Sequence, residues 1–417
     1  MDTRNNIEKQ KFLGMKGLVF FIILTNMFVP LSTDLYLPAL PTMSEYFNVS
    51  GSLVNLTLVG FFFFFAVGTL LFGPLSDKYG RRIILLVGSA LYTVMSLTCA
   101  ISPNVYIMIF ARVFQGVGAG ALIAVSMALV KDCFVGRRRD SILAMVQSFG
   151  GLAPMLAPVL GAFLLKFTSW RGAFFVLTAA GATVFILSLL YQETLEKEDR
   201  TGESTMATIG KLVIVGKNPG FIVPCLIFSL YNFAFMGYIS MSAYIYENQF
   251  GLSEQLYSYF FAANAFLSLL GPMAYVKICG NMNKVKLAYV CFVMYIVCGA
   301  ALIVVGQLTP FLFWISFAPF SFLGSLTRPF SSGLLLDQQK GDTGSASSLI
   351  NGVATIFGSV GMMGISLWSN HVLGLGEIIL ATGVMSIVGW TLLMRSKVKV
   401  VGINVFKSNR YSKRRLL

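Results

Sequence analysis

The sequence contains little charge and few of the side chains from which enzymes build active sites. Charged residues make up 12% of its 417 residues, against about 25% in soluble domains. Its single histidine, His371, leaves almost no room for a histidine triad or a histidine metal cluster. No G-x4-G-K-[ST] sequence occurs, which excludes an ATP-driven pump with a P-loop. We therefore expect a protein that is not an enzyme and that needs no cofactor.

Cysteine gives no sign of a metal site or of a disulfide framework. The six cysteines form no C-x-x-C pair, and most of them fall inside apolar stretches. Cysteine in such surroundings behaves as a small hydrophobic residue. The sequence thus predicts neither metal binding nor disulfides.

Apolar sequence is abundant instead, with 56% hydrophobic residues and a mean hydropathy of +0.77. A helix needs about 20 mostly apolar residues to cross a bilayer. Twelve runs meet this condition, which predicts an all-α integral membrane protein with twelve transmembrane helices. The predicted spans are 17–40, 53–73, 82–101, 105–130, 141–166, 171–191, 219–246, 256–276, 285–306, 310–335, 344–368 and 373–394.

The basic residues gather at alternate ends of these runs. If the N-terminus is cytoplasmic, 27 of the 31 Lys and Arg residues lie in cytoplasmic segments and two lie outside. The positive-inside rule therefore predicts that both termini are cytoplasmic. The same distribution explains the net charge of +14 without a nucleic-acid partner.

The longest polar connection lies at the middle of the chain. It divides the sequence into two predicted six-helix bundles, 1–191 and 219–394, joined by a cytoplasmic linker at 192–218. A basic cytoplasmic tail follows at 395–417. Parallel six-span repeats are one architecture of secondary transporters. We expect such a protein to meet membrane lipid and a small-molecule substrate, and to work as a monomer.

A short connection after the second span has the spacing G-x3-D-x2-G-R-R. Glycine lets helix ends approach closely, and an acid can stabilise a helix N-terminus or pair with arginine. We interpret this connection as a conformational latch, with a tight turn carrying topogenic charge as the alternative. Its residues are Gly73, Asp77, Gly80, Arg81 and Arg82.

Two further patterns lie inside spans. In the fourth span, Arg112 and Gln115 lie one turn apart, and an arginine inside the hydrocarbon region usually marks function. The fifth span combines small residues, which favour close helix packing, with prolines, which favour kinks. We interpret it as an antiporter hinge, and the alternative is a plain packing seam. The residues of this motif are Gly150, Gly151, Pro154, Pro158 and Gly161.

These three patterns, in this order, resemble the loop 2–3, span-4 and span-5 signatures of the major facilitator superfamily. The span-5 signature is associated with antiporters. In addition, the stretch from Pro30 to Pro41 resembles the bicyclomycin/chloramphenicol resistance subfamily of drug:proton antiporters. The resemblance implies two bundles that rock about a central site in the bacterial cytoplasmic membrane. It also implies export of small amphipathic or drug-like molecules in exchange for protons. Transport of a metabolite by the same fold, possibly coupled to sodium, is the alternative.

Asp34 is the only carboxylate expected deep within a span. Counted from the predicted span ends, Asp34 and Arg112 both lie ~10 Å below the outer surface, so we expect them to pair if their helices are neighbours. Burial opposes ionisation of a carboxyl group and a guanidinium favours it. Small rearrangements would then change the protonation of Asp34, as a proton-coupling site requires. The alternative is a purely structural pair.

The remaining candidates are polar or aromatic residues of the spans. Arg328 is a second intramembrane base, and two interpretations stay open: its side chain extends to the membrane interface, or it meets an anionic group. The predicted substrate-binding residues are Asn26, Asp34, Tyr36, Gln115, Tyr231, Asn232 and Tyr238.

Overall fold

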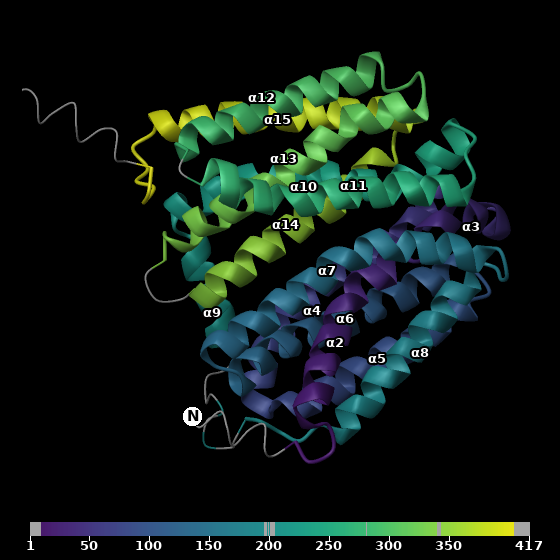
Figure 1. Cartoon of the computed structure of the whole chain (residues 1–417), viewed down its shortest axis with the longest axis vertical. Helices are drawn as coiled ribbons and strands as arrows, with labels where there is room; N and C mark the ends of the chain where they lie inside the picture. The colour runs from purple at the N-terminus through teal and green to yellow at the C-terminus, as the bar shows by residue number, and fades with distance from the viewer. Residues whose placement is uncertain are drawn as a thin grey trace, which may run out of the picture. The chain divides into compact units, whose positions relative to one another are not determined.

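The computed structural model describes residues 10–195, 198, 200, 205–280, 282–339 and 343–403 (Figure 1). This part of the chain is built of helices joined by short connections. In order they are α2 (Gly14–Asp34), η1 (Leu37–Ala39), α3 (Leu40–Phe47), α4 (Gly51–Tyr79), α5 (Arg81–Ala100), α6 (Val105–Cys133), α7 (Gly136–Leu165), α8 (Arg171–Leu190), α9 (Thr205–Gly216), α10 (Pro219–Ala243), η3 (Tyr244–Gln249), α11 (Glu254–Ala274), η4 (Tyr275–Cys279), α12 (Lys284–Val304), α13 (Pro310–Leu336), α14 (Thr343–Ile365) and α15 (His371–Arg395).

The prediction of twelve spans is confirmed for the described residues. Twelve helices there are long and apolar enough to cross a membrane, judged by length and composition. Most of their ends lie within a few residues of the predicted limits. The signal is strong because only a helix satisfies every backbone polar group within its own segment in lipid.

Two spans differ from the prediction in ways that affect the site. The first continues through η1 and α3 to Phe47, with a break in the helix directly after Asp34. The second continues to Tyr79, so Gly73 and Asp77 lie inside α4 and not in a loop. Gly80 alone separates α4 from α5. The prediction of a loop that begins at Gly73 was wrong, because Pro74 is accommodated within the helix.

The chain divides into two compact units, Met1–Thr205 with Ser240–Ala265 and Met206–Ile239 with Phe266–Leu417. In the first unit, α4 packs on α6, and α5 packs on both α6 and α8. In the second unit, α12 packs on α13 and α15. The predicted limits of the bundles and of the linker stay a prediction, and α9 lies inside the predicted linker.

Glycines explain how closely α4 and α6 approach each other. A Cβ atom added at Gly116 of α6 would meet the backbone carbonyl of Phe61, and one at Gly120 would meet the carbonyl of Phe65. From the other side, a Cβ at Gly68 of α4 would lie 2.7 Å from the carbonyl oxygen of Val117. Small residues at such seams permit backbone contact between membrane helices. The seam brings the backbone of α4 within reach of the polar side chains of α6.

Candidate functional site

Gly80 forms the joint between α4 and α5, and its backbone conformation favours glycine. Its φ of +103° is one that L-amino acids rarely adopt. In addition, a Cβ atom there would lie 2.5 Å from Oε2 of Glu193 and 2.8 Å from Nη2 of Arg200. The expected tight turn is therefore present, although it consists of one residue. By contrast, a Cβ at Gly73 would meet nothing within 4 Å, so the expected close approach at Gly73 is wrong.

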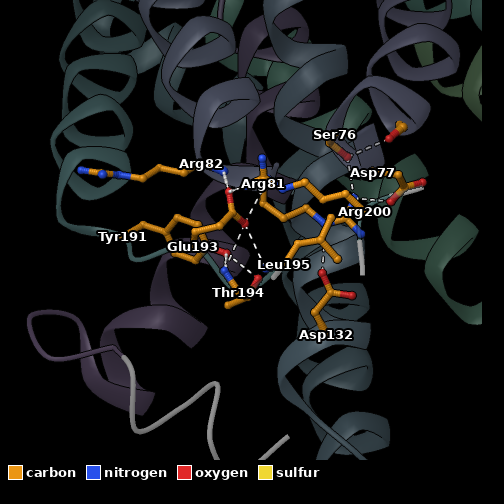
Figure 2. A network of polar contacts seen from close by, with 11 residues as sticks. Ser76, Asp77, Arg81, Arg82, Asp132, Tyr191, Glu193, Thr194, Leu195 and Arg200 are labelled. Carbon is orange, nitrogen blue, oxygen red and sulfur yellow. Dashed lines mark hydrogen bonds and ion pairs between the residues drawn. The ribbon is translucent and has the colours of Figure 1, made fainter. Parts of the chain in front are cut away.

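Arg81 is the centre of a charged network at this joint (Figure 2). Its Nε donates to Oδ2 of Asp132 at 2.9 Å, and its Nη1 lies 2.5 Å from Oδ1 of Asp77. Nη1 also donates to the hydroxyl of Ser76 at 2.6 Å. The Arg81 side chain is 6% exposed, as against 9% for Asp132 and 46% for Asp77. The network links α4, α5 and α6, and Asp132 was not predicted to belong to it.

Glu193 caps the N-terminus of α5 from the segment that follows α8 (Figure 2). Its carboxylate accepts hydrogen bonds from the backbone N–H of Arg81 at 3.1 Å and of Arg82 at 3.0 Å. It also accepts from the backbone of Thr194 and Leu195, each at 3.1 Å. The first N–H groups of a helix have no partner within the helix and favour a negative charge. Glu193 supplies that charge and thereby holds the joint to the end of the sixth span.

Arg112 is fully buried in the first unit. Its Nε donates to the backbone carbonyl of Thr57 at 3.1 Å, and its Nη1 donates to Oε1 of Gln115 at 2.6 Å. The guanidinium carbon lies 4.2 Å from the ring centre of Phe61 and 4.9 Å from that of Tyr36. Nη2 is buried and has no hydrogen-bond partner among the described residues. The predicted neighbourhood of Arg112 and Gln115 is thus confirmed.

The predicted ion pair between Asp34 and Arg112 is wrong for this structure. The Asp34 carboxylate accepts a hydrogen bond from the Thr33 hydroxyl at 2.9 Å, and none of the polar contacts of Arg112 involves it. The reason is geometric. The first span ends at Phe47 and not near residue 40, so Asp34 lies further from that end than the expected depth assumed. The side chain of Asp34 is nevertheless buried, with 5% of the residue exposed.

The other predicted substrate-binding residues of the first unit belong to two separate polar clusters. The Tyr36 hydroxyl lies 3.0 Å from that of Thr57, next to Arg112, and Gln115 donates to the Ser96 hydroxyl at 2.7 Å. Asn26 is separate from this cluster, since its amide donates to the Ser126 hydroxyl at 2.9 Å and links α2 to α6. The structure therefore brings Tyr36 and Gln115 together through Arg112.

The proline and glycine residues of the fifth span lie within one helix, α7, which continues through Pro154 and Pro158. A Cβ atom at Gly161 would meet the backbone carbonyl of Leu35, so α7 packs directly on the break in the first span. At Gly150 a Cβ would meet nothing within 4 Å. Of these two glycines, Gly161 is therefore a point of close packing and Gly150 is not, and the hinge function of the motif stays a prediction.

In the second unit, the three predicted substrate-binding residues, Tyr231, Asn232 and Tyr238, do not all lie together. Tyr231 and Asn232 line a recess together with Arg328. The ring of Tyr238 instead stacks on Phe317, with centroids 3.9 Å apart, and is buried.

In the part of the chain that the structure describes, twelve apolar helices with buried charges and polar clusters are the architecture of a multi-pass membrane protein. The chain belongs to the Major Facilitator Superfamily, whose family model matches residues 22–362. It is thus a transporter and not an enzyme. The apolar helices and the bacterial relatives place it in the bacterial cytoplasmic membrane.

Relatives of similar length support this assignment. The chain is 27% identical over 387 residues to the uncharacterized MFS-type transporter YdgK of Bacillus subtilis, covering 92% of this chain and 96% of YdgK. It is 24% identical over 375 residues to the multidrug resistance protein MdtL of Klebsiella pneumoniae, covering 88% and 92%. This likeness agrees with the resemblance to drug antiporters.

A crystal structure of the peptide transporter POT has the same fold. Its TM-score is 0.73 at 14% identity, covering 95% of this chain and 98% of the other. At this identity the likeness shows the fold alone.

Proposed function

We propose that this transporter exports small amphipathic or drug-like molecules in exchange for protons, by alternating access. The observation that carries the proposal is a pair of opposite charges, Asp34 and Arg112, each buried within a membrane span and not paired with each other. Intramembrane carboxyl groups mark proton relays in pumps and transporters. The multidrug resistance protein among the relatives supports a drug-like substrate.

The positions of Asp34 and Arg112 are suited to a cycle in which the Asp34 carboxylate binds either a proton or the Arg112 guanidinium. Asp34 lies at the break between α2 and η1, where the backbone leaves the helix. Arg112 has one donor, Nη2, that makes no hydrogen bond within the described part of the chain. In our proposal, Asp34 carries the proton while it is apart from Arg112, and pairs with that free donor after the proton has left. The α4–α5 joint around Arg81 serves as the latch in this cycle, and protons are the coupling ion.

The proposal is tested by proton flux in liposomes. Wild type and Asp34→Asn are reconstituted with a pH-sensitive dye inside, a proton gradient is imposed, and candidate drugs are added. We expect drug-dependent flux that is lost in Asp34→Asn while drug binding survives. Asp337→Asn is the matched control, because Asp337 is exposed at the end of α13.

Two outcomes would contradict the proposal in different ways. Flux that persists in Asp34→Asn would move the coupling to another carboxylate. The next candidate is Glu247, a half-buried residue of η3. Absence of flux in wild type with every drug would favour a metabolite or sodium as the transported or coupling species.

A further inference from the structure

A recess in the second unit collects polar side chains from three membrane helices, α10, α13 and α14. It is an open recess whose inner cavity has a volume of about 50 Å³. At roughly 10–15 Å³ for each water, this cavity can hold a carboxylate head group but not a whole drug-sized molecule. Its polar lining includes Ser229, Asn232, Thr327, Arg328, Ser332 and Asn351.

Arg328 is the charged group of this recess. It lies within α13, well before the end of that helix at Leu336, yet it is exposed. Its guanidinium has no hydrogen bond or ion pair with any residue that the structure describes. Arg112, by contrast, is fully buried and bound to Thr57 and Gln115. Arg328 is thus free to meet a ligand.

The charge of the recess has one sign. No Asp or Glu is among the residues that line it, and its other polar groups are mostly hydroxyls and amides, which can donate hydrogen bonds to an anion as well as accept them. The amide of Asn232 and the hydroxyl of Ser332 also lack partners in the described part of the chain. A cation in a membrane span is costly unless something compensates its charge. The missing partner of this recess is therefore an anion.

The walls beside Arg328 are aromatic. Phe228 and Tyr231 line the recess, and the Tyr231 ring stacks on Phe235 with centroids 5.3 Å apart. Arginine binds a planar carboxylate through two parallel hydrogen bonds. An anionic head beside aromatic walls fits a compound with a carboxylate and an apolar body.

We propose that this recess binds the carboxylate of the transported compound, so that the substrates are amphipathic organic anions. The inference rests on the proposed export function and names the substrate class for it. It also decides between the two interpretations of Arg328 in favour of the anionic partner.

The test compares ligands that differ only in charge. The purified full chain in nanodiscs of zwitterionic lipid is titrated with 1-pyrenebutyrate, with its uncharged methyl ester and with 1-pyrenemethylammonium, against empty nanodiscs. Because a hydrogen-bonded charge is worth roughly a tenfold to hundredfold change in affinity, we expect the carboxylate to bind at least about tenfold more tightly than the ester. Arg328→Gln should remove this difference and leave ester binding intact. Arg328→Lys should restore part of it, and Arg395→Gln, at an exposed position at the end of α15, should behave as wild type.

Three results would overturn the inference. The first is equal binding of carboxylate and ester to wild type, and the second is a loss of both ligands to the same extent in Arg328→Gln. In the third, phosphatidylglycerol in the nanodisc removes the preference, which would make the recess a site for lipid headgroups. Because binding is measured without a gradient, its result stands apart from proton flux. A missing flux with the preference intact would reject the export proposal alone.

Discussion

Gly161 of α7 lies against the backbone carbonyl of Leu35, the residue that directly follows Asp34. A motif associated with antiporters thus touches the point at which the first span breaks next to the proposed proton site. Because of this contact, a movement of α7 along its axis would displace the backbone next to Asp34.

We predict that Gly161→Ala destabilises the protein by about 1–3 kcal/mol, because the new methyl group has no space beside Leu35 and the two helices must separate. Gly150→Ala is the control from the same helix, since its methyl group would meet nothing within 4 Å. That substitution should be neutral or stabilise the helix by up to about 1 kcal/mol. Thermal unfolding in detergent measures both, and equal effects would contradict the packing argument.

The two partners of Arg81 should differ strongly in their contribution. Asp132→Asn breaks a buried pair and leaves Arg81 without its less exposed partner, while Asp77 still compensates its charge, so we expect a cost of about 1.5–3 kcal/mol. Asp77 is 46% exposed, and Asp77→Asn should cost less than about 1 kcal/mol. Chemical unfolding followed by tryptophan fluorescence distinguishes the two variants. If Asp77→Asn lowered the free energy of unfolding more than Asp132→Asn, the exposed ion pair would stabilise the protein more than the buried one, which would contradict this prediction.

Removal of the cap on α5 should loosen the joint. Glu193→Ala leaves the N–H groups of Arg81 and Arg82 without an acceptor, and we expect a loss of about 0.5–2 kcal/mol. Amide exchange at the start of α5 should rise in the same variant. Glu198→Ala is the control, because Glu198 is exposed in the same segment. Unchanged exchange at α5 would show that the cap does not hold the helix end.

Gln115 should be indispensable as the partner of Arg112. Gln115→Ala leaves a buried guanidinium donor without its acceptor and removes one of the two hydrogen bonds of the Ser96 hydroxyl, which should cost about 1–3 kcal/mol. Gln115→Glu keeps an acceptor for Arg112 and should retain most of the stability. Thermal unfolding measures this difference. A protein that tolerated alanine as well as glutamate would contradict the role of Gln115.

The number and order of the spans could be predicted from the sequence, because apolar length and the placement of basic residues record them directly. The break after Asp34 could not, since Leu35 to Ala39 are as apolar as the helix before them. This failure led to the second one. With the span end placed too early, Asp34 and Arg112 received matching depths and a pairing that the structure does not contain.

The site was predictable where partners are near in sequence. Asp77 and Arg81 lie one turn apart and were expected together, as were Arg112 and Gln115. Asp132 and Glu193 approach Arg81 from positions 51 and 112 residues away. Their sequence surroundings do not distinguish them from other charges at helix ends, so only the packing of α6 and α8 reveals them.

The cap that Glu193 forms on α5 also limits where this transporter can be recombined with its relatives. A chimera joined directly after α8 would take residue 193 from the other parent, and the α5 N-terminus would then depend on a foreign side chain. A crossover after Leu195 would keep the cap with the helix that it serves. Natural exchange of halves within the superfamily should observe the same boundary.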